Sequence, residues 1–454
     1  MMSMNSRVSG DQIPHLRWLS FIACCLPWFF LLAWLTEVSW FLCDDAFISF
    51  RYVRNLLEGH GLVFNPGERV EGYSNFLWVL ELSVLWGLFG LRPELSAPWL
   101  SVACTVGTIA AVLWWAARTP GLEHRRLLAW IAIGLLCSSA TFAAWTSAGG
   151  LETRQFTLFV VLAVVCLTVR CDSRWGLLAA SCSLAAASYT RPEGPLLAVC
   201  CIAWFILQRV VARRSLRLDL GELVWLVAPF VVLVAAHSVF RYGYYGEWLP
   251  NTYYAKHIRP WYESGFRYLW AATLETGLYL LVPLAVFALR EAWRESRDLR
   301  HALPLLCIIL HAAYVLRIGG DHFEYRPMDF YWPLLAIPAS DGILRLGSRV
   351  SLFLRHLIPT GVPLRGAARP GPCALFLFAP VVFYASALQG VVLVEGEADR
   401  AEWLMAAPGM ETLAATANDL HSQMQRHWVA GRVSDHRSFA DMRIQLWAEY
   451  ERME

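Results

Sequence analysis

Long apolar runs dominate this 454-residue chain and restrict its fold more than any other feature. Only 16% of the residues are charged and the mean hydropathy is +0.44, whereas soluble domains carry about a quarter charged residues. The sequence therefore predicts an all-α integral membrane protein rather than a soluble enzyme with one anchor. The apolar runs lie near residues 19–42, 76–91, 97–117, 127–146, 155–169, 175–189, 195–211, 222–240, 268–289, 301–317, 328–346 and 373–394.

The run at 76–91 is marginal as a span, because crossing a bilayer takes about 20 residues and this run contains Glu81. We predict a juxtamembrane helix that does not cross. The arginine-rich loops then all fall on one side, which the positive-inside rule makes cytoplasmic. The sequence thus predicts eleven spans, with the N-terminus inside and the C-terminus outside. These loops lie near residues 118–126, 170–174, 209–217, 290–300 and 345–369.

The loops of the opposite side are rich in Asp, Glu, Arg, Tyr, Asn and Gly, so we expect the chemistry on the outer side of the membrane, where no nucleotide is available. The expected organisation is a catalytic membrane domain over 1–394, whose first external loop (43–96) carries juxtamembrane helices, and a small periplasmic helical tail over 395–454. The polar loops are 43–75, 147–154, 189–194, 241–268 and 317–330.

The stretch 44–75 is the most informative of these loops. Asp44 can cap a short helix that runs to about Glu58. At 100° per residue the helix has a polar face and an apolar face, which suits a helix lying on the bilayer surface. Glycines then end it, and Asn65-Pro66-Gly67 reads as a turn. The predicted polar face is Asp44, Arg51, Asn55 and Glu58, and the apolar face is Ala46, Phe50, Val53 and Leu57.

Lys256 is the single lysine of the chain and lies beside His257 in an external loop. It can supply a compact positive charge for a phosphate, or it can be a solvated lysine without a role. His257, Arg191 and Arg326 are further candidates for phosphate binding. The alternatives are a structural pair of Arg191 with Glu193, and of Arg326 with Asp321 or Glu324.

Twelve cysteines lie mostly inside apolar runs, with no CxxC motif and no His/Cys spacing typical of a metal site. The chemistry proposed below does not demand a metal or another cofactor. Glu152 follows two glycines at the start of an apolar run, where it can bind sugar hydroxyls or complement the helix dipole.

Several motifs resemble those of a known family and occur in the same order. They are Asp44-Asp45, the run from Arg51 to Asn55, Gly59–Gly61, Asn65–Glu68, Glu71–Asn75, Gly150-Leu151-Glu152-Thr153, Thr190–Gly194, Leu249–Tyr254 with Ala255-Lys256, and Gly319-Gly320-Asp321. In these residues the chain is similar to the GT-C membrane glycosyltransferases that use a polyprenyl-phosphate sugar. Within that family it is most similar to the lipid-linked D-arabinofuranosyltransferases, which act on cell-wall arabinan or on type IV pilin.

The resemblance implies a GT-C fold, a diacidic motif in the first external loop, and decaprenyl- or undecaprenyl-phosphate arabinofuranose as donor. The short tail favours a pilin Ser or Thr as acceptor, and a cell-envelope glycan is the alternative. Matching residues expected to bind the sugar or the acceptor are Arg51, Asn55, Glu71, Tyr73, Asn75, Glu152, Asn251, Tyr254 and Asp321.

Transfer from a lipid phosphate needs a base for the acceptor hydroxyl and charge stabilisation for the leaving phosphate. We expect Asp44 to be the base and Asp45 to orient it or bind sugar hydroxyls. Stereochemistry stays open, because one displacement inverts the anomeric carbon and a nucleophilic carboxylate retains it. A lipid-linked-sugar flippase is the rival class, although transporters gather their binding groups near the bilayer midplane.

Overall fold

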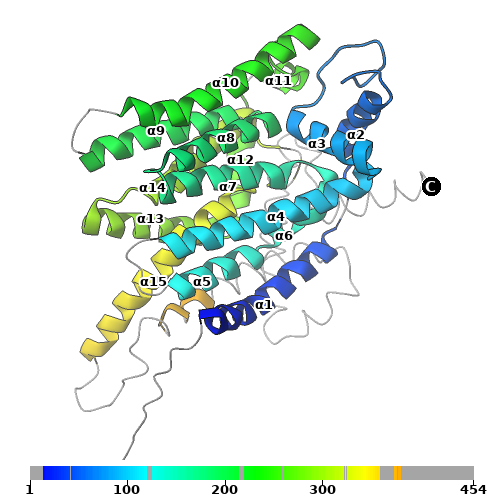
Figure 1. The fold of residues 1–454 in the computed structure, drawn as a ribbon. Coiled ribbons are helices and arrows are strands. Elements are labelled where there is room, and N and C mark those ends of the chain that lie inside the picture. Colours follow the sequence, from blue (N-terminus) through cyan, green and yellow to red (C-terminus); the bar gives the residue numbers. More distant parts are fainter. Residues whose placement is uncertain are drawn as a thin grey trace, which may run out of the picture.

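The computed structural model describes residues 14–40, 42–119, 125–213, 219–256, 260–321, 323, 325–357, 373–375 and 377–379. Within these ranges every regular element is a helix, as the sequence predicts (Figure 1). The elements are α1 (Pro14–Val38), α2 (Asp44–Leu57), α3 (Phe76–Phe89), α4 (Pro93–Arg118), α5 (Arg125–Cys137), α6 (Ala140–Ser147), η1 (Ala148–Gly150), α7 (Thr153–Val169), α8 (Arg174–Thr190), α9 (Gly194–Arg213), α10 (Leu220–Tyr245), α11 (Asn251–Lys256), α12 (Tyr262–Glu275), α13 (Leu278–Ser296), α14 (Ala302–Ile318), η2 (Arg326–Met328) and α15 (Tyr331–Leu357).

Several helices are long and apolar enough to cross a membrane, so the chain is a multi-pass membrane protein. In the described residues four qualify: Ser20–Glu37 of α1, α4, Gly194–Val211 of α9, and α10. The pair α5 and α6 makes a fifth if it is one span, although it bends by 72°. The expected count of eleven is therefore not confirmed, and most of the run 373–394 and the whole tail 395–454 lie outside the described residues.

Two expected spans are broken helices. The run 127–146 divides at Ser138 and Ser139, where the hydroxyl of Ser139 accepts a hydrogen bond from the Phe142 N–H and starts α6. The run 268–289 divides between α12 and α13 at Gly277, whose φ of +71° is a left-handed conformation that glycine adopts without strain. The prediction of a single helix at each place is wrong, because apolarity alone does not locate breaks.

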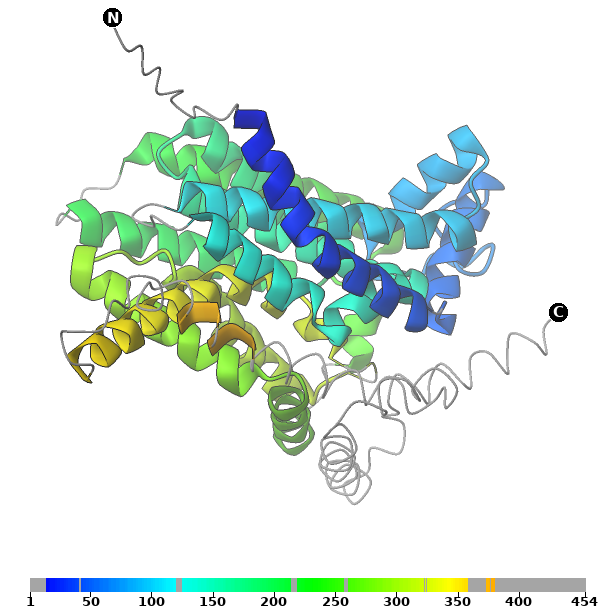
Figure 2. The same cartoon turned by 90° about the horizontal axis from the view of Figure 1, so that it is seen from below.

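The long helices pack side by side around one apolar core. Pairs with extensive contact include α7 with α8, α13 with α15, and α8 with α10. Helix α1 packs on α5 and α6 and crosses the bundle obliquely (Figure 2). The largest side chains fully buried in this core include Trp115, Phe142, Trp204, Phe205 and Tyr331.

A second apolar cluster forms at one end of the bundle, where α2 and α3 pack against each other (Figure 1). Helix α2 also packs against η1. Helix α3 has 14 residues, fewer than the roughly 20 that span a bilayer. That length agrees with a juxtamembrane helix. The buried residues of this cluster include Ala46, Phe50, Val53, Trp78 and Leu82.

Helix α2 spans nearly the expected residues, but two details of the prediction are wrong. Its N-cap is Cys43, and Asp44 is already in the first turn, where its Oδ1 accepts from the Asp45 N–H at 2.9 Å. Asn55 is buried rather than on a polar face, because its amide donates to the carbonyls of Val63 and Phe64, each at 2.8 Å. The side chain thus closes the loop that folds back over α2.

The end of α10 holds the loop 58–75 in place. Tyr245 donates to the Leu62 carbonyl at 2.9 Å, and the Leu62 N–H donates to the Tyr244 hydroxyl at 3.1 Å. Arg241 pairs with Glu71 at 2.6 Å. Burial raises the pKa of Glu71, although Arg241 acts in the opposite direction. The expected turn at Asn65-Pro66-Gly67 is present, with φ of +92° at Gly67 and a bond from the Glu68 N–H to the Asn65 carbonyl.

Candidate active site

A cavity of about 630 Å³ opens at the α2 and α3 end of the bundle. Its wall is made by helix ends: the first turn of α2, the junctions before α7 and α9, the end of α14, and η2. Helix ends leave backbone and side-chain polar groups free of the apolar core, which is why the polar residues gather here. The lining residues are Asp45, Ile48, Ser49, Gly72, Tyr73, Ser74, Asn75, Leu151, Glu152, Arg191, Pro192, Glu193, Pro250, Thr252, Tyr253, Trp261, Tyr314, Ile318, Asp321, Arg326 and Pro327.

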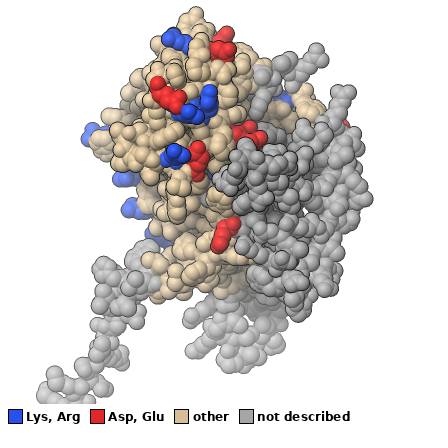
Figure 3. Space-filling model, turned by 90° about the vertical axis from the view of Figure 1, so that its right-hand side faces the viewer, with Lys and Arg blue, Asp and Glu red and all other residues tan. Residues whose placement is uncertain are grey.

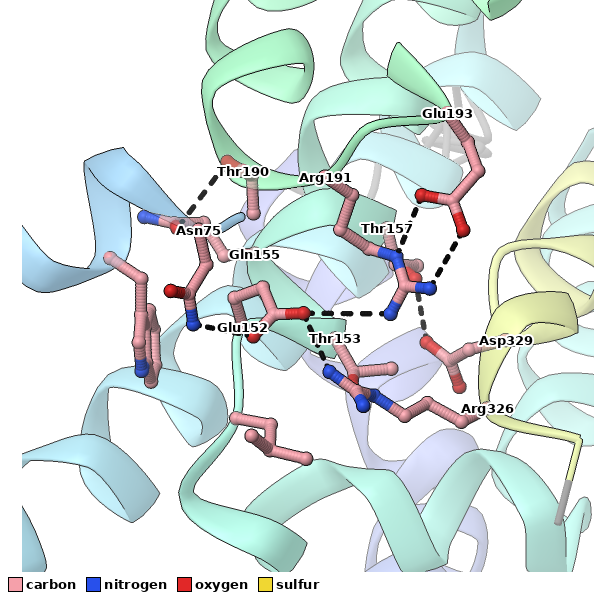
Figure 4. Close-up of polar contacts among 12 residues, drawn as sticks. Asn75, Glu152, Thr153, Gln155, Thr157, Thr190, Arg191, Glu193, Arg326 and Asp329 are labelled. Atoms are coloured by element: carbon pink, nitrogen blue, oxygen red, sulfur yellow. Dashed lines mark hydrogen bonds and ion pairs between the residues drawn. The ribbon is translucent and has the colours of Figure 1, made fainter. Parts of the chain in front are cut away.

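Glu152 is the centre of the polar wall of this cavity (Figure 4). Its Oε1 accepts from Arg326 Nη2 at 2.7 Å and from Arg191 Nη1 at 3.5 Å. Its Oε2 accepts from Asn75 Nδ2 at 2.8 Å. Glu152 is 3% exposed, so removing it would leave two arginines close together with one fewer counter-charge. The carboxylate thus holds both guanidinium groups in a fixed arrangement.

Arg191 is paired more tightly with Glu193 than with Glu152. Its Nη2 and Nε donate to the two Glu193 oxygens at 2.8 and 3.2 Å, the forked geometry that arginine and carboxylate prefer. Burial disfavours the charged form of both groups, but the attraction between their opposite charges is stronger. The pKa of Arg191 is therefore raised and the pKa of Glu193 is lowered. The alternative that pairs Arg191 with Glu193 is therefore correct, and Arg191 also lines the cavity.

Arg326 is held from three directions. Nη2 binds Glu152, Nε donates to the Thr153 hydroxyl at 3.1 Å, and the guanidinium lies 5.2 Å from the centre of the Phe323 ring. Its Nη1 makes no hydrogen bond to any residue within the described ranges. Arg326 pairs with Glu152, not with Asp321 as the sequence alternative had it; Glu324 lies outside the described residues.

A fully buried ion pair fixes the segment that carries Arg326. Asp329 Oδ2 lies 3.2 Å from Arg154 Nη1 and accepts from the Thr157 hydroxyl at 2.6 Å. The Arg154 guanidinium also lies 3.6 Å from the centre of the Phe142 ring. These contacts tie η2 to α7 three residues beyond Arg326, so they set where its guanidinium points. Neither Arg154 nor Asp329 was predicted from the sequence. The one available signal was that each charge interrupts or borders an apolar run.

The two aspartates of the diacidic motif face different spaces. Successive residues of a helix are rotated by about 100°, so Asp44 and Asp45 cannot share one direction. Asp45 is half-buried and lines the cavity, with Ser49 one turn further along α2. Asp44 is exposed and lines a separate hollow. Both carboxylates lie in the first turn of α2, where the helix dipole favours negative charge.

The structure brings together seven of the residues predicted to bind substrate. Besides Asp45, the cavity is lined by Arg191, Arg326, Tyr73, Asn75, Glu152 and Asp321. Tyr253 lines the cavity, whereas the predicted neighbour Tyr254 does not. Ser49 lines the cavity as well but was not predicted from the sequence. The available signal was its position four residues after Asp45, which places both on one face of a helix.

The other predicted residues do not line the cavity. Arg51 is exposed and donates to the Phe64 carbonyl at 3.3 Å, and Asn55 and Glu71 make the structural contacts described above. Asn251 donates its backbone N–H to the Glu71 carbonyl at 2.9 Å, and its side chain is exposed. These contacts hold the first loop, and none of the four residues lines the cavity. Helix α11 ends at Lys256, whose side chain, like all of His257, lies outside the described residues.

A testable consequence concerns Asn55. We expect Asn55→Ala to lower the free energy of unfolding by about 1–3 kcal/mol, because two loop carbonyls lose a buried donor. The donor KM should stay within twofold of wild type, since Asn55 does not reach the cavity. Thermal unfolding in detergent and initial rates measure the two quantities. A large rise in donor KM with unchanged stability would return Asn55 to the binding site.

The arrangement fits transfer of a group from a phosphate. A carboxylate, Asp45, lies on one wall and can accept a proton. The guanidinium groups of Arg191 and Arg326, which Glu152 holds in place, line the same cavity and can stabilise a leaving oxyanion. Among the described residues no cluster of three or more His, Cys, Asp or Glu side chains has the geometry to hold a metal ion.

The fold defines the class of protein. The structure is similar to ArnT from Cupriavidus metallidurans bound to undecaprenyl phosphate, with a TM-score of 0.51, 14% identity, and coverage of 93% of this chain and 78% of that one. The apo structure of the same protein matches equally well. The chain therefore has the GT-C fold of membrane glycosyltransferases, as the sequence predicts.

Curated relatives give a more particular likeness. The chain is 29% identical over 365 residues to the terminal β-(1→2)-arabinofuranosyltransferase of Mycobacterium tuberculosis, covering 72% of this chain and 55% of the relative. It is 26% identical over 369 residues to the enzyme of that name from Corynebacterium glutamicum, covering 72% and 52%. The resemblance to arabinofuranosyltransferases is thus confirmed. The chain spans about half the length of these relatives, and no family model matches it.

Proposed function

We propose that this protein is a membrane glycosyltransferase that moves D-arabinofuranose from a polyprenyl phosphate to a hydroxyl outside the cytoplasm. The observation that carries the proposal is the cavity in which Asp45 shares one space with Arg191 and Arg326, in a chain similar to arabinofuranosyltransferases over 72% of its length. The fold adds support, because the structurally similar ArnT was solved with undecaprenyl phosphate.

In the proposed reaction, Asp45 accepts the proton of the acceptor hydroxyl while the oxygen forms a bond to the anomeric carbon. The bond from that carbon to the phosphate oxygen breaks, and the phosphate leaves with the electron pair. Arg326 is the residue best suited to receive this charge, since its Nη1 is not used by the described residues and its other nitrogens are fixed. The sequence prediction of Asp44 as base is thereby revised in favour of Asp45.

The proposed orientation has the cavity on the periplasmic side of a bacterial inner membrane. Helices α8 and α14 end at the cavity, whereas α7 and α9 begin there. Their opposite ends therefore carry the arginine-rich loops, such as 170–174 and 209–217. The positive-inside rule assigns those loops to the cytoplasm, which supports an outward-facing site.

The acceptor is the finer part of the proposal. The two curated relatives are named for forming a terminal β-(1→2) arabinofuranosyl linkage, which favours the end of an envelope arabinan. A type IV pilin Ser or Thr, expected from the sequence, stays a prediction. The flippase alternative is less well supported, because the polar groups gather at helix ends on one side of the bundle rather than at mid-span.

Transfer from synthetic decaprenyl-phosphate arabinofuranose to a short arabinan and to pilin tests the proposal with purified protein. Product on arabinan supports the glycan acceptor, and product on pilin alone supports protein glycosylation. If the labelled donor moves across the proteoliposome membrane and no product forms on either acceptor, the protein is a transporter and not an enzyme. Asp45→Asn is the matched inactive control for the first two outcomes.

A further inference from the structure

A second hollow of about 560 Å³ lies on the other side of the first turn of α2. We call it the outer groove. It is bounded by α2, the loop residue Phe64, the end of α3 and the start of α4. Ile48 lines both the outer groove and the cavity, so the two spaces adjoin at this side chain. The lining residues are Asp44, Phe47, Ile48, Phe50, Arg51, Arg54, Phe64, Trp86 and Glu94.

The outer groove combines aromatic rings with paired charges. Phe47 and Phe64 are 40% and 43% exposed, and Trp86 is half-buried beside them. Apolar rings that stay open to solvent at the wall of a hollow suit a ligand with its own apolar faces. Pyranose and furanose rings have such faces, formed by their C–H groups, and their hydroxyls can bond to carboxylates and guanidinium groups.

The charges of the outer groove favour an uncharged ligand. Two acidic residues, Asp44 and Glu94, balance two arginines. Both arginines already have partners: Arg54 Nε binds Glu58 at 2.7 Å, and Arg51 Nε donates to the Phe64 carbonyl. A phosphate would meet the two carboxylates and find no concentrated positive charge. Figure 3, which views this end of the molecule, shows several acidic side chains directly beside basic ones in the coloured part of the surface.

We propose that the outer groove is an acceptor subsite for an uncharged oligosaccharide. This inference rests on the proposed function. The sugar to be extended lies in the cavity with its hydroxyl at Asp45, and the preceding sugars of the chain pass Ile48 and lie against Phe47, Phe64 and Trp86. Asp44 then binds a sugar hydroxyl and takes no part in the chemistry. The two aspartates therefore serve two spaces, one for reaction and one for recognition.

The variant Phe47→Ala/Phe64→Ala tests the subsite, because both rings are well exposed and their removal leaves no large cavity. We expect its KM for an arabinan hexasaccharide to rise at least tenfold. Its KM for a disaccharide, its donor KM and its kcat should stay within twofold. Phe353→Ala is the matched control, since Phe353 is 62% exposed on α15 and lines neither space.

Calorimetry on Asp45→Asn protein gives a readout without turnover. The hexasaccharide should bind, and Phe47→Ala/Phe64→Ala should weaken its Kd at least tenfold. Binding without transfer by wild type would overturn the proposed function and leave the subsite standing. An unchanged Kd, or no hexasaccharide binding at all, would overturn the subsite while transfer to a disaccharide could still be seen. A rise in donor KM instead of acceptor KM would assign the outer groove to lipid and also overturn it.

Discussion

Asp45→Asn is expected to lower kcat for arabinofuranosyl transfer by about 10²- to 10⁴-fold, the usual contribution of a general base. The amide has the same shape as the carboxylate but cannot take the proton of the acceptor hydroxyl. The fold should survive, because Asp45 is half-buried and its loss from the first turn of α2 costs about 0.3–1 kcal/mol of helix-dipole stabilisation. Single-turnover rates with saturating donor and acceptor measure the effect.

Asp44→Asn is the matched control, because it changes the adjacent carboxylate of the same turn. We expect its kcat to fall less than tenfold, since Asp44 lines the outer groove rather than the cavity. Its KM for long acceptors should rise. The reverse ranking, with Asp44→Asn inactive and Asp45→Asn active, would restore Asp44 as the base and show that the cavity described here is not where proton transfer occurs.

Glu152→Gln is expected to lower kcat/KM for the donor by at least about 100-fold, the cost of misplacing catalytic groups by about 1 Å. The amide keeps the hydrogen bonds that its oxygen can accept but removes the charge shared by Arg191 and Arg326. Because all three side chains are buried or nearly so, we also expect a loss of about 3–5 kcal/mol in the free energy of unfolding. Thermal unfolding in detergent and donor kinetics measure the two effects.

Glu222→Gln provides the comparison, because Glu222 forms an ion pair that does not line the cavity. Glu222 lies at the start of α10, and its Oε1 is 3.1 Å from Arg209 Nη2. It should cost some stability and leave donor kinetics within twofold. Arg326→Lys separates positioning from charge, since lysine keeps the charge but cannot bind Glu152 and Thr153 together. Full activity in Arg326→Lys would show that the precise arrangement around Glu152 is not needed for transfer.

The sequence was informative about the fold because apolar runs of the right length report burial directly. The all-helical membrane class, the helix after Asp44 and the separate helix at 76–89 follow from periodicity and glycine positions. The breaks in the runs 127–146 and 268–289 could not be predicted. They depend on local choices, such as the Ser139 cap and the left-handed Gly277, that leave no trace in hydropathy.

The sequence predicted many of the residues that line the cavity, but it did not predict which of them contact one another. Seven of the expected residues meet in one cavity, because they come from loops that topology brings to one side. Asn55 and Glu71 do not line the cavity, since a polar residue in such a motif can make a loop contact instead of contacting a ligand. Arg154 and Asp329 were missed, because the partner that makes such a pair tolerable lies on another helix.

The partners of Glu152 are far from it in the sequence, and this has a consequence for biosynthesis. Asn75 is made 77 residues before Glu152, Arg191 follows 39 residues after it, and Arg326 comes 174 residues after it. At about 5–20 residues per second, a nascent chain holds Glu152 without Arg326 for roughly 9–35 seconds. We expect the early partners Asn75 and Arg191 to shelter this carboxylate during that interval. Wild-type chains arrested before residue 326 should therefore insert normally. Arrested chains that carry Asn75→Ala should be more sensitive to protease. Equal protease sensitivity of the two would show that no such sheltering is required.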